Sequence, residues 1–173
     1  MLSQSYKVQP PIVDINGVIF KENDEIPYTG KITVFWSNNG IKEEGIYREG
    51  VKSGLWKYWY ATGKLFSKGI FRNGLKTGVW IEWHENGNKK TQSIYRNGLK
   101  NGREINWSLE EVKLSEYSYQ SGRKDGSFKK WFSSGNKKSS GNFVKGKENG
   151  KFIEWYDNGK KYIEQEYKDG KRH

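Results

Sequence analysis

The sequence predicts an all-β fold: an elongated, twisted single antiparallel β-sheet meander built from six 24-residue β-hairpin repeats. Three observations predict it. Glycine recurs at a constant spacing, aromatic residues recur at fixed distances after each glycine, and turn-forming pairs such as Asn-Gly separate short aromatic segments. Because no window of helical length shows a period of about 3.6 residues, no helix is expected.

The 24-residue period is clearest in four columns of residues, counted from Gly30 as position 0. Position 0 holds Gly30, Gly54, Gly78, Gly102, Gly126 and Gly150. Position 5 holds Phe35, Trp59, Trp83, Trp107, Trp131 and Trp155. Position 17 holds Tyr47, Phe71, Tyr95, Tyr119, Phe143 and Tyr167. Position 20 holds Gly50, Gly74, Gly98, Gly122, Gly146 and Gly170. Glycine at fixed positions predicts backbone with positive φ.

Each repeat is predicted to contain two strands and two turns. Segments such as "LWKYWY" and "VWIEWH" are short and aromatic, as in strands, and they end at "ATGK" and "ENGN", which are typical of tight hairpin turns. The second strand, for example "LFSKGIFR", ends at another glycine turn, "RNGLKTG". Six consecutive hairpins follow from this pattern.

The chain is predicted to divide into an N-terminal cap and a repeat array. Residues 1–29 form the cap, in which "GVIFKENDEIPYTG" is expected to be an extra hairpin leading into the first repeat. The six repeats are placed at 30–53, 54–77, 78–101, 102–125, 126–149 and 150–173. The last strand, in "YKDGKRH", would leave an open sheet edge, which favours edge-to-edge homodimers.

A pairing register follows if the first turn is centred on positions 8 and 9, since residues whose positions sum to 17 then face each other. Large apolar residues at position 2 would face glycine or serine at position 15 in four repeats, and a ring over glycine would shield the backbone. These four pairs are Ile32–Gly45, Trp56–Gly69, Trp80–Ser93 and Phe128–Gly141. In the fourth repeat the pair is Glu104–Tyr117, so the ring would lie on the opposite strand.

Two sets of residues are candidates for partner binding. The tryptophan column should project from the face opposite to position 2, as the core of a thin sheet or as a binding stripe. It consists of Trp59, Trp83, Trp107, Trp131 and Trp155. Six lysines follow three of the turns and would line one long edge, either solvated or facing acidic protein, anionic lipid or nucleic acid. They are Lys89, Lys90, Lys137, Lys138, Lys160 and Lys161.

Composition narrows the class of function. The net charge is +11, and residues 123–173 carry 14 Lys and Arg against 7 Asp and Glu, so acidic or polyanionic partners are favoured. The chain has no cysteine, which excludes disulfides and thiolate metal sites. The start has no signal-peptide pattern, and no apolar run approaches the roughly 18 residues of a transmembrane helix. The expected localisation is therefore cytoplasmic as given, or periplasmic or secreted if a signal peptide has been removed.

Residue types needed for catalysis are not gathered by the repeat. His84 stands at position 6, where other repeats have an aromatic residue, and the pair Glu43–Glu44 has no counterpart at the same positions in other repeats. The sequence therefore predicts no enzyme, no catalytic residue, no metal and no cofactor.

The segments "GLWKYWYATGKL…GIFRNGLKTG", "GVWIEWHENGNK…SIYRNGLKNG" and "GKFIEWYDNGKKYIEQEYKDGK" resemble the MORN-repeat variant family, and more specifically bacterial YwqK-type toxin–antitoxin antitoxins. The pattern departs at "GREINWSLEEVKLSEYSYQSG", where the first turn has lost its glycine. The resemblance implies a β-sheet scaffold for protein–protein binding, of which neutralising a bacterial toxin is one version. The expected partner is a protein, acidic in character. The alternative is a peripheral binder of anionic membrane lipid, envelope polymer or nucleic acid.

Overall fold

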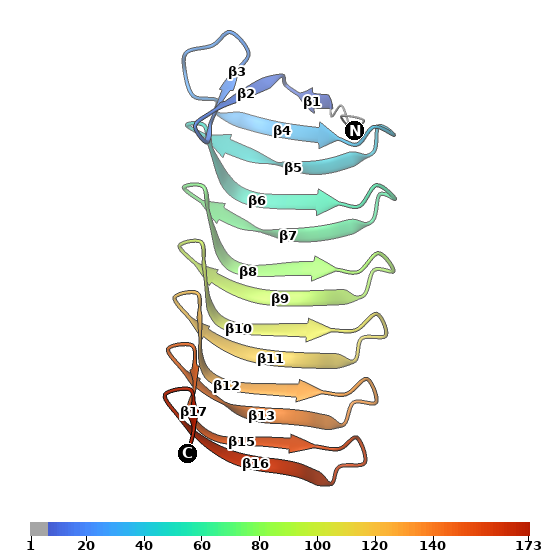
Figure 1. Ribbon diagram of the computed structural model, residues 1–173. Helices are drawn as coiled ribbons and strands as arrows, with labels where there is room; N and C mark the ends of the chain where they lie inside the picture. The colour runs from blue at the N-terminus through green and yellow to red at the C-terminus, as the bar shows by residue number, and fades with distance from the viewer. Residues whose placement is uncertain (1–6) are drawn as a thin grey trace, which may run out of the picture. The chain divides into compact units, whose positions relative to one another are not determined.

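The computed structural model describes residues 7–173, which fall into two compact units that divide after Gly87. Every element in the described residues is a β-strand, so the all-β prediction is confirmed. From β4 onward, successive strands within each unit pair as antiparallel hairpins (Figure 1). Each unit is described by itself below.

The first unit contains strands β1 to β8. In its sheet the order is β1-β4-β5-β6-β7-β8, while β2 and β3 form a separate two-stranded hairpin. The bounds are β1 Lys7–Gln9, β2 Ile12–Ile15, β3 Val18–Lys21, β4 Gly30–Phe35, β5 Ile41–Arg48, β6 Val51–Trp59, β7 Leu65–Arg72 and β8 Leu75–Trp83.

The second unit contains strands β9 to β17, in the order β9-β10-β11-β12-β13-β15-β16-β17, with β14 paired to β13. The bounds are β9 Lys89–Arg96, β10 Leu99–Trp107, β11 Lys113–Gln120, β12 Arg123–Trp131, β13 Lys137–Val144, β14 Lys147–Glu148, β15 Gly150–Trp155, β16 Lys161–Lys168 and β17 Lys171–Arg172. The short β17 folds back on the end of β16, pairing Tyr167 with Arg172, so the predicted open edge is partly covered.

A hairpin that was not predicted precedes the expected one. It is formed by β2 and β3, with its turn at Asn16–Gly17. The predicted hairpin follows as a short antiparallel pairing, in which Phe20 faces Pro27 and the Tyr28 N–H donates to the Ile19 carbonyl at 2.7 Å.

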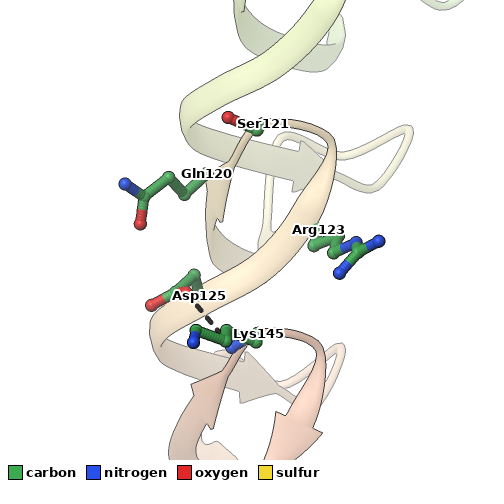
Figure 2. A pocket seen from close by; sticks show the side chains of 5 residues that line it. All are labelled: Gln120, Ser121, Arg123, Asp125 and Lys145. Carbon is green, nitrogen blue, oxygen red and sulfur yellow. Dashed lines mark hydrogen bonds between the residues drawn. The ribbon is translucent and has the colours of Figure 1, made fainter.

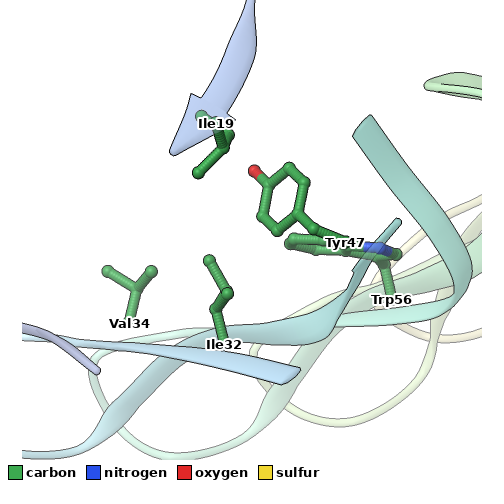
Figure 3. Close-up of a cluster of buried hydrophobic side chains, with 5 residues drawn as sticks. All are labelled: Ile19, Ile32, Val34, Tyr47 and Trp56. Atoms are coloured by element: carbon green, nitrogen blue, oxygen red, sulfur yellow. The ribbon is translucent and has the colours of Figure 1, made fainter. Parts of the chain in front are cut away.

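Ile19 of the β2–β3 hairpin reaches a buried cluster with Ile32, Val34, Tyr47 and Trp56 (Figure 3). The hairpin thus covers the first repeat of the unit with apolar contacts, and β1 adds a strand beside β4.

The two turns of each repeat differ in type, which the sequence reading did not distinguish. The second turn is a two-residue loop in which both residues have positive φ, for example Asn73 at 50° and Gly74 at 75°. This is the pattern of a type I′ turn, which matches the twist of its strands. The first turn is longer: in the second repeat the Tyr60 N–H donates to the Lys64 carbonyl at 2.9 Å, and Gly63 takes the left-handed conformation.

In the fourth repeat the first turn keeps this conformation without glycine. Glu111 takes the left-handed position at φ 62°, and its N–H donates to the Ser108 carbonyl at 3.2 Å. The Ser108 hydroxyl oxygen accepts from the N–H groups of Glu110 and Val112 at 3.1 and 3.3 Å. The serine therefore holds a turn whose backbone would suit glycine better.

The predicted register is confirmed within both units, with one shift. The pairs Ile32–Gly45, Trp56–Gly69, Phe128–Gly141 and Glu104–Tyr117 all face each other. Between positions 4 and 5 each repeat hairpin within a unit has a β-bulge, so position 5 pairs with position 11 and not with position 12.

The ring that covers a position 15 glycine comes from the next repeat, and at Gly141 the directly facing Phe128 contributes as well. A Cβ added to Gly45 would overlap the indole of Trp56, and one added to Gly69 would overlap Trp80. Each of these rings therefore covers the glycine of the preceding repeat. Neither Gly45 nor Gly69 has positive φ, so the prediction of positive φ is wrong at position 15, where glycine is needed because a ring occupies its side-chain space.

Candidate binding surfaces

The tryptophan column ends the first strand of each repeat, immediately after the bulge. All five tryptophans are half-buried, as parts of the sheet with one portion open to solvent. Because of the bulge, Trp131 pairs directly with Lys137, and Trp155 with Lys161. The column and the predicted lysines therefore meet at one end of the strands.

In the second unit, lysines lie over the tryptophan rings. The ammonium groups of Lys89, Lys113 and Lys137 lie 5.9, 5.2 and 5.0 Å from the ring centroids of Trp107, Trp131 and Trp155. Each lysine is at position 11 of the repeat before its tryptophan. Cation–π contacts of this kind hold a charged group at a fixed place on the surface. We call these three pairs the lysine–tryptophan ladder.

The structure places the remaining predicted lysines near the ladder. Lys90, Lys138, Lys160 and Lys161 are exposed, and Lys138 lies 5.3 Å from the ring centroid of Phe132. Lys161 forms an ion pair with Glu164, which also pairs with Lys151 at 2.6 Å. Hydrogen bonds from these two lysines lower the pKa of Glu164 to about 2.

The sequence reading missed Lys113, although a simple signal was present. Position 11 is lysine in four successive repeats: Lys89, Lys113, Lys137 and Lys161. The prediction selected lysines that follow glycine turns, and the fourth repeat lacks that glycine, so Lys113 was not considered.

Hydrogen bonds between successive turns support the ladder. In the second unit, the Asn88 side-chain amide donates to the Leu109 carbonyl at 2.8 Å, and the Asn136 amide donates to the Asp157 carbonyl at 2.7 Å. The Ser134 hydroxyl also donates to the Asp157 carboxylate. These bonds link turns one repeat apart. They therefore fix the relative positions of the turns that adjoin the ladder.

A second lysine column, also missed, lies at position 22 and covers the opposite face of the strands. In the first unit, the Lys52 ammonium is 3.8 Å from the centroid of the Trp56 ring and donates a 3.1 Å hydrogen bond to the Tyr58 hydroxyl. Lys76 lies 4.2 Å from the Trp80 ring centroid. Burial and nearby Glu43 raise the pKa of Tyr47 to about 12 and also raise the pKa of Tyr58.

The same column continues in the second unit. Lys124 lies 4.2 Å from the ring centroid of Tyr117, and Lys100 forms an ion pair with Glu104. Burial opposes the charge on Lys100, but its hydrogen bond and attraction to Glu104 outweigh burial and raise its pKa. Glu104 is buried where four other repeats have a ring, and it accepts a 2.9 Å hydrogen bond from the Ser93 hydroxyl.

The concave regions of the second unit include a hollow and a groove. The first is an open hollow of about 400 Å³ beside the type I′ turns, lined by Gln120, Ser121, Arg123, Asp125 and Lys145 (Figure 2). Its Asp125 carboxylate accepts a 3.1 Å hydrogen bond from the Lys145 backbone N–H, so this group is used to hold the turn.

The second concave region is a groove of about 360 Å³ with an aromatic floor. Its rings are Tyr117, Phe128, Phe143 and Phe152, and its polar groups are Lys124, Lys130, Ser139, Glu148 and Glu154. The groove lies on the same face as the position 22 lysines.

His84 is half-buried at the end of a strand, as its place in the aromatic column predicts. Among residues 7–173, no group of three or more His, Asp or Glu is arranged to hold a metal ion. Within that same range no helix is present that could cross a membrane.

Comparison with known protein families finds a match over part of the chain. Three segments match the MORN repeat variant. They are residues 52–73, 76–97 and 148–169. Each begins at position 22 and ends at position 19, within the same 24-residue frame. No curated protein matches the chain. MORN repeats are in general binding and scaffold repeats, so a scaffold role is the coarse function that the family supports.

Proposed function

We propose that this protein is a non-enzymatic repeat scaffold that binds an acidic protein partner through the lysine–tryptophan ladder of its second unit. The observation that carries the proposal is the regular placement of Lys89, Lys113 and Lys137 on tryptophan rings. Lysine side chains normally lose conformational entropy when they bind. The tryptophan rings already restrict the side chains of Lys89, Lys113 and Lys137. Binding a partner therefore removes less conformational entropy from these lysines than from free ones.

The ladder favours a protein over a single-stranded nucleic acid. Bases bind nonspecifically by stacking on exposed aromatic faces. Here a lysine from the same chain already lies over each of the three indoles. The rungs are also two strands apart, about 9.6 Å, which exceeds the spacing of stacked bases. Carboxylates on an extended or folded acidic surface could meet the lysines without displacing them.

The charge of the second unit supports an acidic partner. Residues 123–173 carry 14 Lys and Arg against 7 Asp and Glu, and Lys138 and Lys160 add exposed charge beside the ladder. Such a field accelerates association with acidic proteins and is weakened by salt. In its finer form, the proposal is that the partner is a bacterial toxin and that binding blocks its active site, in an antitoxin or immunity role.

The test is affinity capture with the intact chain and two charge-reversed variants. In the ladder variant, the three ladder lysines Lys89, Lys113 and Lys137 and the neighbouring Lys138 become Glu. In the matched control, the exposed lysines Lys145, Lys147, Lys168 and Lys171, near the type I′ turns, become Glu, which changes net charge equally. Circular dichroism establishes that both variants are folded.

We expect one stoichiometric acidic protein to be retained by the intact chain and by the control, and lost by the ladder variant. Identification of that protein by mass spectrometry decides whether it is a toxin. Retention of only nucleic acid or anionic lipid, weakening with salt as counterions are released, would replace this proposal by the polyanion alternative. Equal loss of the captured protein in both variants would show that binding depends on net charge and not on the ladder.

A further inference from the structure

The column at position 22 is interrupted in the fifth repeat. In four repeats the residue at this position is lysine, paired across the sheet with the aromatic residue at position 17. The pairs are Tyr47–Lys52, Phe71–Lys76, Tyr95–Lys100 and Tyr119–Lys124. In the fifth repeat the register is the same, but Phe143 pairs with Glu148. A carboxylate therefore takes the place of an ammonium group.

In the other repeats the lysine lies over rings of the same face. Lys52 lies 3.8 Å from the Trp56 centroid and 5.5 Å from that of Phe71, which are positions 2 and 17 of the next repeat. The corresponding rings after Glu148 are Phe152 and Tyr167, whose centroids are 4.9 Å apart. Within residues 7–173, no lysine or arginine lies over Phe152.

The groove of about 360 Å³ opens where the column is interrupted, with Glu148 and Glu154 on its walls. Phe128 and Phe152, 5.3 Å apart, stand where the first unit has the larger Trp56 and Trp80, which leaves space above the sheet. Glu148 is half-buried, and no ion pair involves either glutamate in the described part of the chain.

We propose that this groove binds a cationic side chain, lysine or arginine, of a partner protein, with the charge between Glu148 and the face of Phe152. The chain itself shows that this arrangement is favourable, since it places its own lysines over rings at the equivalent sites. Ring faces attract cations, and a half-buried carboxylate adds a charge-assisted hydrogen bond.

The two lysines that line the groove leave one place in it for the cation of a partner. Lys124 is directed at Tyr117 and Phe143, with its ammonium 4.2 and 5.2 Å from their centroids. Lys130 is exposed and shares a row with Ser139 and Glu154 across three strands. The space beside Glu148 and Phe152 is therefore where a guest cation meets carboxylate and ring together.

The test uses capped tripeptides with a central lysine, arginine, norleucine or glutamate as probes, and NMR shifts of the groove residues as the readout. We expect saturable shifts at Phe128 and Phe152 with the lysine and arginine peptides. Norleucine, which has a similar length and no charge, should bind at least tenfold more weakly, and the glutamate peptide should not bind.

Two variants of Glu148 make the test specific. Glu148→Lys restores the column, so the chain should fill the groove with its own lysine, raise its Tm and lose peptide binding. Glu148→Gln keeps the shape and should weaken binding at least tenfold. The control Glu166→Lys makes the same charge change at an exposed residue of β16 and should bind normally.

The inference is overturned if the lysine peptide causes no saturable shift, if norleucine binds equally, or if both Glu148 variants bind as well as the intact chain. It does not rest on the lysine–tryptophan ladder, which shares no residue with the lining of the groove. The ladder variant should therefore bind the lysine peptide normally, whichever way affinity capture turns out.

Discussion

Replacing Gly69 by alanine tests why glycine recurs at position 15. A Cβ at Gly69 would overlap the Trp80 indole, with the ring Cγ only 2.6 Å away. Trp80 is 4% exposed, and its Nε1 donates a 3.2 Å hydrogen bond to the Ile70 carbonyl. The ring therefore has little room to move. Because φ at Gly69 is not positive, alanine introduces no backbone strain, and the steric effect is isolated.

The expected cost follows from the contacts that would be disturbed. Overpacking costs about 1–3 kcal/mol and a displaced hydrogen bond about 1 kcal/mol. Displacing the ring from Lys76, 4.2 Å away, adds about 0.5 kcal/mol, and alanine returns about 0.7 kcal/mol by restricting the unfolded chain. We expect Gly69→Ala to lower the free energy of unfolding by about 3 kcal/mol, within the range of these terms.

Urea unfolding followed by tryptophan fluorescence and circular dichroism measures this loss. The control is Gly63→Ala, where φ is 83° and no atom lies within 4 Å, so only backbone strain of about 1–2 kcal/mol is expected. In a Trp80→Phe background the cost of Gly69→Ala should fall by at least about 1 kcal/mol, whereas that of Gly63→Ala should not change. A cost below about 0.5 kcal/mol, or no coupling to Trp80, would refute the steric explanation.

Three further predictions concern single residues. Glu111→Gly should raise the free energy of unfolding by about 1 kcal/mol, because glycine accepts φ 62° without strain. The control Glu110→Gly should not raise it, and urea unfolding of both variants measures the difference. Glu104→Ala should cost about 1–3 kcal/mol by leaving the Ser93 hydroxyl without its acceptor, and Glu104→Ala with Ser93→Ala should recover part of this loss. At high pH, the folded state holds the Tyr47 proton up to about pH 12, but the unfolded state releases it near pH 10, so stability should fall as pH rises through this window. Tyr47→Phe should make that decline shallower in pH-dependent unfolding, and an unchanged slope would contradict the assignment.

The predicted edge of lysines and tryptophans shows how far sequence reasoning reached into the candidate site. It selected Lys89, Lys137, Trp107 and Trp155, which the structure brings together in pairs. It missed Lys113, because it searched after glycine turns and the fourth repeat builds its turn with Glu111. It also missed the position 22 lysines, although their recurrence every 24 residues was visible in the sequence.

The groove could not be predicted, because it depends on the size of rings in neighbouring repeats. Phe128 and Phe152 leave a space that Trp56 and Trp80 do not, and Glu148 borders that space only after β14 folds back on β13. Nothing in a single repeat indicates this.

The sequence by itself determined the repeat length, the strands, the turn positions and the pairing register as far as position 4. These are local properties, since alternation of side chains and glycine-containing turns fix a hairpin within about 20 residues. The tertiary structure decided which ring covers which glycine and which lysine lies over which ring. It also decided the pairing of the tryptophans, which the bulge shifts by one residue. These are contacts between repeats. Every repeat has nearly the same residues, so the sequence pattern cannot distinguish a partner in the same repeat from one in the next, and sheet twist and packing make that choice.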